Sequence, residues 1–135
     1  FAKTIAEIHR VNEDVKIEVV KAIHGYIPAL KGREIEENVG YIIDDGTNRV
    51  YHTSDTIGFK NDYKCTILML PVVNHGLVLG PWEAALFALE TEAKLVIPFH
   101  YDNPVHPADF ELVKKCFSEK QLNYRFLELG EMIEV

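Results

Sequence analysis

Three side chains that can bind a metal ion stand at the ends of predicted strands. The segment VVKAIH ends at His24, VYHTSD ends at Asp55, and LVIPFH ends at His100. Each follows an apolar run, so a packed strand would hold the side chain in place and the following loop would leave room for a ligand. Two imidazoles and a carboxylate are ligands that suit zinc and similar divalent ions. Together they predict a metal site.

Each of these residues also has a purely structural interpretation. A single histidine at a strand end is often a hydrogen-bonded packing residue, and Asp55 alone suits a turn in which its side chain bonds the backbone two positions on. His52 has two candidate roles: it orients a metal ligand, or it is a strand residue that faces the other side. It lies three positions before Asp55, which places the two on opposite faces of a regular strand and favours the second role.

Loop residues supply candidate substrate contacts. Asn74 and His75 follow a buried strand and are candidates for substrate binding or proton donation, or they form a polar loop tip that makes its own turn. Lys31 and Arg33 are placed to meet an anionic substrate, or they are simply solvated. Tyr101 follows His100 and packs either over the site or under the last helix.

The elements that position these residues follow from hydrophobic periodicity. Helices are predicted over 1–11, over 81–93 with Trp82, Ala85, Leu86, Leu89 and Ala93 as its apolar stripe, and from Pro107 with Phe110, Val113 and Phe117 on one face. Strands are predicted over 15–24, in a hairpin about Asp45-Gly46 spanning 39–55, over 65–73 and 94–100, and as two short strands about Gly130. An irregular loop is predicted over 25–38.

Composition limits the class of protein. The chain has 135 residues, which favours a single domain, and a net charge of −7, which argues against a general nucleic-acid binder. No run reaches the ~18 apolar residues of a membrane span, and no secretory signal is visible. Cys65 and Cys116 are predicted to be reduced packing thiols, which favours the cytoplasm. Strands alternating with helices in the second half favour an α/β layered fold.

Taken in chain order, five segments of the sequence resemble the C-terminal half of the metallo-β-lactamase superfamily. VVKAIH, GYIIDDGTNRVYHTSDTIGF, ILMLPVVNHGLVLGPWEAALFA, LVIPFHYD and LELGEMIEV carry the resemblance, which covers nearly the whole chain. It is strongest for metal-dependent hydrolases related to L-ascorbate 6-phosphate lactonase. The resemblance implies half of a four-layer αββα sandwich, in which a mixed sheet carries helices on one face.

The resemblance also implies roles for the candidate residues. His24 would complete one metal site, His100 would complete a second, and Asp55 would bridge two divalent ions, zinc or manganese. With Asp55 and His100 in catalysis, the implied activity is hydrolysis of a lactone, ester or phosphodiester in a small anionic substrate by a metal-activated hydroxide. Ser54 departs from the glycine that the family places before this aspartate.

The HxHxDH motif of the family does not occur in these residues. That motif supplies most ligands for both metals, so the 135-residue chain alone is expected to be inactive. The helical pattern that starts at Phe1 without a capping signal is expected to continue from a longer protein. The alternative is a degenerate half that acts as a structural or partner-binding module. A third interpretation is a generic α/β domain in which Asp55 and the histidines are structural.

The packing of the two apolar strands indicates that this chain binds another polypeptide. The strands over 65–73 and 94–100 are apolar on both faces, and the two later helices cover only one. We therefore expect a large apolar interface with the complementary half that carries HxHxDH or, failing that, with a second copy of the chain.

Overall fold

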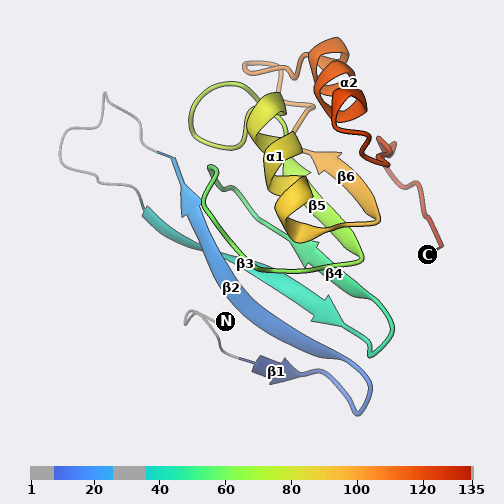
Figure 1. Cartoon of the computed structure of the whole chain (residues 1–135). Helices are drawn as coiled ribbons and strands as arrows, with labels where there is room; N and C mark the ends of the chain where they lie inside the picture. Colours follow the sequence, from blue (N-terminus) through green and yellow to red (C-terminus); the bar gives the residue numbers. More distant parts are fainter. Residues whose placement is uncertain (1–7, 26–35, 135) are drawn as a thin grey trace.

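The computed structural model describes residues 8–25 and 36–134 as one six-stranded sheet with two helices. In chain order the elements are β1 (Ile8–Arg10), β2 (Lys16–His24), β3 (Glu36–Asp44), β4 (Arg49–His52), β5 (Ile67–Pro71), α1 (Pro81–Thr91), β6 (Leu95–Phe99) and α2 (Phe110–Glu119). The strands lie in the sheet in the same order as in the chain (Figure 1). β1 to β4 pair antiparallel, whereas β4, β5 and β6 are parallel. The sheet is thus mixed, and the predicted α/β class is confirmed.

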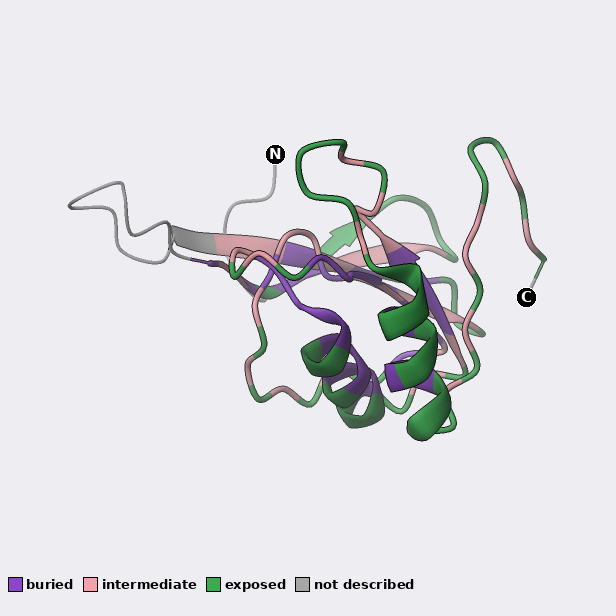
Figure 2. Cartoon of the chain, turned by 90° about the horizontal axis from the view of Figure 1, so that it is seen from above, coloured by how far each residue is buried: buried purple, intermediate pink, exposed green. Residues whose placement is uncertain are grey.

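Both helices lie on one side of the sheet (Figure 2). The core between them and the strands contains Ile42 and Tyr51 from the hairpin, Leu68 and Val96 from the parallel strands, and Phe117 from α2. The parallel strands need a crossover, and α1 provides it between β5 and β6. Cys65 and Cys116 are both buried and free, as predicted.

The opposite face of the sheet is also apolar. One row across it pairs Ile17 with Ile43, Ile43 with Val50, Val50 with Ile67, and Ile67 with Leu95. Side chains alternate along each strand, so this row points away from the helices that cover Ile42 and Tyr51. The described helices therefore cover one face of the sheet, and Ile43 remains exposed on the other.

The hairpin prediction is confirmed. β3 and β4 pair about Asp45-Gly46, and Gly46 has φ 86°, a conformation that glycine adopts without strain. The Asp44 carboxylate accepts from the Gly46 N–H at 2.8 Å and pairs with Arg49 at 2.8 Å. The predicted loop over 25–38 is too long, because β3 already begins at Glu36.

The helix predicted over 1–11 is wrong where the structure describes it. Ile8–Arg10 form β1, paired with β2, while residues 1–7 lie outside the described residues. The Asn12 side chain accepts from the N–H groups of Asp14 and Val15, both at 2.8 Å, and closes a hairpin turn. Three apolar positions could not distinguish a helix from a short strand that follows an Asx turn.

The apolar stripe predicted for α1 is also largely wrong. Trp82, Leu86 and Leu89 are exposed, whereas the buried face consists of Ala84, Ala85, Phe87, Ala88 and Thr91 with Pro81. Apolar residues nearly encircle this helix, so periodicity alone did not select a face. Small alanines allow the helix to lie close to the sheet, whereas Trp82, Leu86 and Leu89 point outward.

Two boundaries near the C-terminus differ from prediction. α2 begins at Phe110 rather than at Pro107, because the Asp109 carboxylate caps it by accepting from the Leu112 N–H at 3.0 Å. The two strands predicted about Gly130 are wrong over the described residues up to 134. Only Tyr124 bridges to Val96, and the chain then leaves the sheet and turns between Glu128 and Glu131.

Candidate metal centre

The structure brings His24, Asp55 and His100 together beyond the ends of three strands. The Nε2 atom of His24 lies 3.8 Å from Oδ2 of Asp55, and the Nε2 atom of His100 lies 3.8 Å from Oδ1. Each carboxylate oxygen thus faces a different histidine. All three side chains are partly exposed, which leaves the cluster open to a ligand.

Hydrogen bonds to three neighbouring segments fix the position of Asp55. Thr53 N–H donates to the Met69 carbonyl at 3.0 Å, and Ile57 N–H donates to the Ile23 carbonyl at 2.8 Å. The Thr56 hydroxyl accepts from Ile23 N–H at 3.0 Å, and the Asn38 amide donates to the Asp55 carbonyl at 2.9 Å. Asp55 is therefore held between β2 and β5 by its neighbours, while its carboxylate remains available.

Backbone conformation at two positions is unusual. Ser54, directly before Asp55, has φ 55°, and His100 has φ 61°. Both lie in the left-handed region, which is unfavourable for residues other than glycine. These conformations turn the chain sharply where each strand ends and direct the side chains of Asp55 and His100 toward one another.

His24 and His100 differ in the hydrogen bonding of their Nδ1 atoms. His24 Nδ1 lies 3.2 Å from the Gly25 carbonyl, which can only accept, so Nδ1 carries the proton and the Nε2 lone pair faces Asp55. Such a bond is the usual way in which a protein orients a metal-binding imidazole. His100 Nδ1 is buried and has no hydrogen-bond partner among the described residues.

These observations test whether the residues fit a divalent ion. A separation of 3.8 Å is too long for a hydrogen bond but can be spanned by two coordinate bonds of roughly 2.0–2.2 Å through one ion. Within residues 8–25 and 36–134, no group of three or more metal-competent side chains is close enough to hold an ion by itself. The donor set therefore fits a partial contribution to one or two metal sites, with further ligands needed.

His52 lies on the face of the sheet away from the helices. Its ring stacks on Phe99 at 4.6 Å, and its Nδ1 accepts from the Ser54 N–H at 3.1 Å. Burial lowers the pKa of this imidazole, and the negative charge of Asp55 partly opposes that effect. His52 thus stabilises the turn that presents Asp55 through the Ser54 backbone.

The loop after β5 places His75 beside the cluster. Its ring lies 6.0 Å from that of His100 and 4.9 Å from that of His106, and its Nδ1 accepts from the Leu77 N–H at 3.1 Å. Burial, followed by the two neighbouring imidazoles, lowers the pKa of His75. Sequence analysis missed His106 because it belongs to no predicted element; the dense run HYDNPVH was the only available signal.

The other candidates from the loops lie elsewhere. Asn74 is exposed, and its side chain oxygen lies 3.2 Å from where a Cβ on Gly80 would stand, at the start of α1. Tyr101 packs on Phe110 and Phe126, near the last helix rather than over Asp55. Lys31 and Arg33 lie outside the described residues.

Comparison with known proteins identifies the family. A family model described as "Beta-lactamase superfamily domain" matches residues 3–101, and the chain belongs to this family. A protein of Natranaerobius thermophilus named "UPF0173 metal-dependent hydrolase" is 34% identical over 119 residues, which cover 80% of this chain and 53% of that protein. One of Aeropyrum pernix with the same name is 36% identical over 105 residues, covering 70% and 43%. The chain thus spans about half the length of these relatives.

Solved structures show the same fold. A metallo hydrolase of Ignicoccus hospitalis superposes with a TM-score of 0.76 at 23% identity, covering 98% of this chain and 59% of that one. An isothiocyanate hydrolase from Delia radicum gut bacteria superposes with a TM-score of 0.75 at 15% identity, covering 98% and 59%. The metallo-β-lactamase fold expected from the sequence is confirmed.

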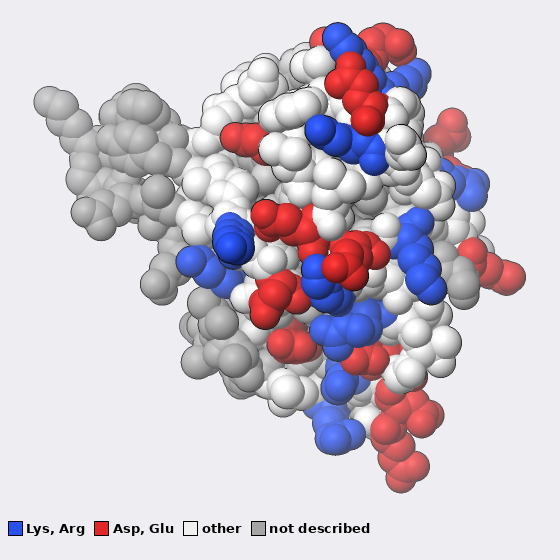
Figure 3. All heavy atoms as spheres, in the orientation of Figure 1, with Lys and Arg blue, Asp and Glu red and all other residues white. Residues whose placement is uncertain are grey.

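Neither described helix is long and apolar enough to cross a membrane. On the face seen in Figure 3, acidic and basic side chains are interspersed rather than gathered by sign.

Proposed function

We propose that the protein carrying this chain is a metal-dependent hydrolase, with His24 and His100 as ligands of two ions and Asp55 as the carboxylate between them. One observation carries the proposal: each oxygen of Asp55 faces the Nε2 atom of a different histidine at 3.8 Å. The names of relatives that are 34% and 36% identical, both metal-dependent hydrolases, support it.

Bound zinc or manganese would supply hydroxide near neutral pH and stabilise negative charge that develops on the substrate. The chain supplies the geometry. The Gly25 carbonyl keeps the proton of His24 on Nδ1 and so directs Nε2 toward Asp55. The backbone N–H groups of Thr53 and Ile57 and the hydroxyl of Thr56 make hydrogen bonds that keep Asp55 at the end of the sheet. Asp55 and His100 are thereby presented together to the reacting centre.

The substrate is proposed to be a small anionic molecule with a lactone, ester or phosphodiester bond, as in the lactonase-like group that the sequence resembles. His75 is the proposed substrate contact and proton donor, since its Nδ1 accepts from Leu77 and its Nε2 therefore carries the proton in the neutral ring. Asn74 is proposed to contact a more distant part of the substrate from its place beside Gly80.

Three ligands shared between two ions leave both incomplete, so we propose that these 135 residues alone are inactive and that a complementary half with HxHxDH completes the site. A second copy of this chain is the less favoured partner. The apolar row from Ile17 to Leu95 supports such a docking face, because the described helices lie on the other side of the sheet. A cytoplasmic setting is part of the proposal, supported by the free, buried thiols of Cys65 and Cys116.

The test replaces Asp55 with alanine in the complete protein and measures metal content by mass spectrometry, melting temperature, and hydrolysis of lactone, ester and phosphodiester panels. Asp55→Ala should lower metal content and abolish hydrolysis with little change in melting temperature, because it removes a ligand rather than core packing. Asp62→Ala, at an exposed aspartate in the loop before β5, is the matched control and should change nothing. Full metal content and full activity in Asp55→Ala would contradict the proposal. A wild-type protein that binds no metal would favour the alternative, a degenerate structural or partner-binding module.

A further inference from the structure

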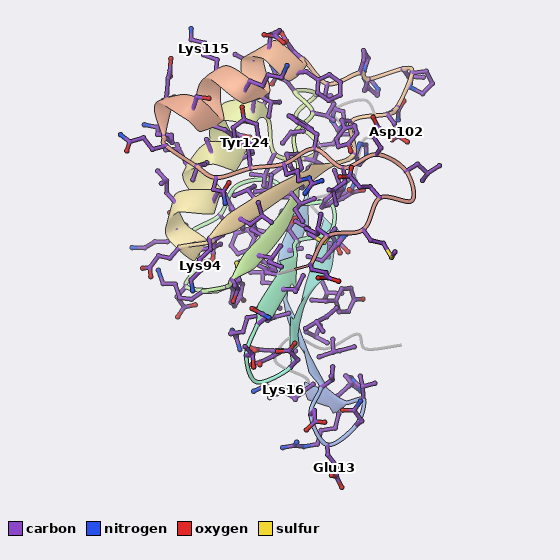
Figure 4. All side chains as sticks on the ribbon, turned by 90° about the vertical axis from the view of Figure 1, so that its right-hand side faces the viewer. Glu13, Lys16, Lys94, Asp102, Lys115 and Tyr124 are labelled. Atoms are coloured by element: carbon purple, nitrogen blue, oxygen red, sulfur yellow. The ribbon has the colours of Figure 1, made fainter. Side chains whose placement is uncertain are left out.

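A pocket of about 710 Å³ opens beyond the end of β6, next to the candidate metal centre. It lies between the end of β6 at Phe99 with the loop that follows it, the start of α2 at Phe110, and the C-terminal segment from Phe126 to Glu131. Figure 4 views the molecule from this side and labels Asp102 in the loop. The volume falls within the roughly 300–1,000 Å³ of small-molecule sites.

The walls of this pocket are aromatic. The rings of Tyr101, Phe110 and Phe126 meet edge to face, with centroids 5.5 Å, 5.6 Å and 5.0 Å apart. Phe110 nevertheless stays 40% exposed, although it lines a concave surface. A flat apolar group placed against these rings would remove aromatic surface from water and gain the further attraction of ring edges for ring faces.

Hydrogen bonds hold the C-terminal wall in place. The Tyr101 hydroxyl donates to the Leu127 carbonyl, and the Glu131 carboxylate accepts from the Glu128 N–H at 2.9 Å. Arg125 pairs with the same carboxylate. The segment is thus a closed turn fastened to the loop after β6, so the pocket is formed before any ligand arrives.

The charge of the lining selects among ligands. It contains the carboxylates of Asp102, Glu128 and Glu131 and neither lysine nor arginine; Glu131 is paired with Arg125, so Asp102 and Glu128 carry the unopposed negative charge. Negative groups of one sign around a concave site repel an anion and favour a neutral or positive one. The anionic part of a substrate therefore belongs at the metal centre and not in this pocket.

His100 joins the two sites. It lines the pocket, and its Nε2 atom lies 3.8 Å from Oδ1 of Asp55. We infer that the pocket binds an aromatic group without negative charge, carried by the substrate whose scissile bond lies at Asp55. This inference rests on the proposed hydrolase function and adds to it the class of organic group that the enzyme selects.

Binding of three small probes to the complete protein, measured by ligand-observed NMR, tests the inference without any need for hydrolysis. Benzyl alcohol and benzylamine should bind, and benzoate should bind at least tenfold more weakly. Phe126→Ala should weaken the first two at least tenfold, whereas Trp82→Ala, which removes an exposed aromatic ring on α1, should have no effect. Equal binding of all three probes, no binding at all, or indifference to Phe126→Ala would overturn the inference.

A second variant guards against misfolding, since Phe126 packs on three aromatic neighbours, Tyr101, Phe110 and Tyr124. Asp102→Asn with Glu128→Gln changes only exposed side chains and should raise the affinity for benzoate severalfold; unchanged affinity would count against the inference.

Kinetics separate this inference from the proposed function. Phe126→Ala should raise KM for benzyl acetate but not for methyl acetate, with kcat retained. Activity that depends on Asp55 without a benzyl preference contradicts the pocket alone, and probe binding in a protein that hydrolyses nothing contradicts the hydrolase alone.

Discussion

Gly25 donates its backbone N–H to the carbonyl oxygen of Leu77 at 2.7 Å. This single bond joins the end of β2, directly after His24, to the loop that carries His75. The two segments approach so closely that a Cβ on Gly25 would lie 2.6 Å from the Cα of Leu77 and closer still to the Gly76 carbonyl. Only glycine fits, and the relative positions of His24 and His75 depend on that contact.

Gly25→Ala should therefore destabilise the protein and weaken the proposed metal centre. The methyl group meets backbone atoms that cannot rotate away, so we expect a loss of about 1–3 kcal/mol in unfolding free energy, as for other overpacked sites. Urea unfolding measures this loss, and metal content should fall with it because His24 moves. Gly58→Ala is the matched control: its Cβ would meet only the Leu79 side chain, at an ordinary 3.7 Å. Equal stability of the two variants would contradict the close approach at Gly25.

Ser54→Gly should stabilise the turn before Asp55. Ser54 has φ 55°, which costs about 1–2 kcal/mol for a residue with a Cβ and little for glycine. Since glycine also gives up more chain entropy on folding, we expect a net gain of about 1 kcal/mol in thermal or urea unfolding.

Ser54→Ala separates the backbone effect from the hydroxyl. It keeps the Cβ and the strained φ, so its stability should remain at or below that of the wild type. A gain in Ser54→Ala equal to that in Ser54→Gly would show that the hydroxyl, not the backbone, is the source of strain.

The sequence alone predicted the convergence of His24, Asp55 and His100 better than it predicted the elements at either end of the chain. Each of the three residues comes at or just after the end of a strand, and the Asp45-Gly46 hairpin fixes the pairing of the two strands before Asp55. Such signals are local and strong. The positive φ at Ser54 and His100 was not predictable, because neither residue type announces that conformation.

The contributions of His52, His106 and the aromatic pocket could not be predicted, for a different reason. His52 acts through a hydrogen bond to the Ser54 backbone and by stacking on Phe99, which lies 47 positions later in the sequence. The pocket forms where the C-terminal segment leaves the sheet after Tyr124, whereas the alternation of apolar residues predicted that it would stay. Contacts of this kind arise only from the tertiary fold.

Asp44 should make the stability of the hairpin depend on pH. The Gly46 N–H, followed by Arg49 and Lys16, lowers the pKa of this carboxyl from its ordinary value of 3.8. A depressed pKa in the folded state contributes stability above the unfolded value, and that stability is lost as pH falls through the folded value. We therefore expect the free energy of unfolding of the wild type to decrease as the pH is lowered below about 4. At pH 7, Asp44→Asn should lower that free energy by about 1.5 kcal/mol.

Urea titrations at a series of pH values compare the two proteins. The curves of wild type and Asp44→Asn should converge at acid pH, because protonation of Asp44 has the same effect as the substitution. Glu92→Gln, at an exposed partner of Lys64, is the control and should change little at any pH. Parallel curves for Asp44→Asn and wild type would show that Asp44 does not cause the acid sensitivity.

Ile43 and Leu86 test whether the second face of the sheet is covered in the complete protein. Their exposed fractions here are nearly equal, 41% and 42%, but Ile43 lies on the face away from the helices and Leu86 on the outer side of α1. If a complementary half packs on the apolar row, Ile43→Lys buries a charge in an apolar interface and should cost about 2–4 kcal/mol. Leu86→Lys should stay within about 0.5 kcal/mol, as is usual at the surface. Unfolding of the complete protein gives both values, and equal, small effects would show that the face containing Ile43 remains in water and would rule out the proposed docking.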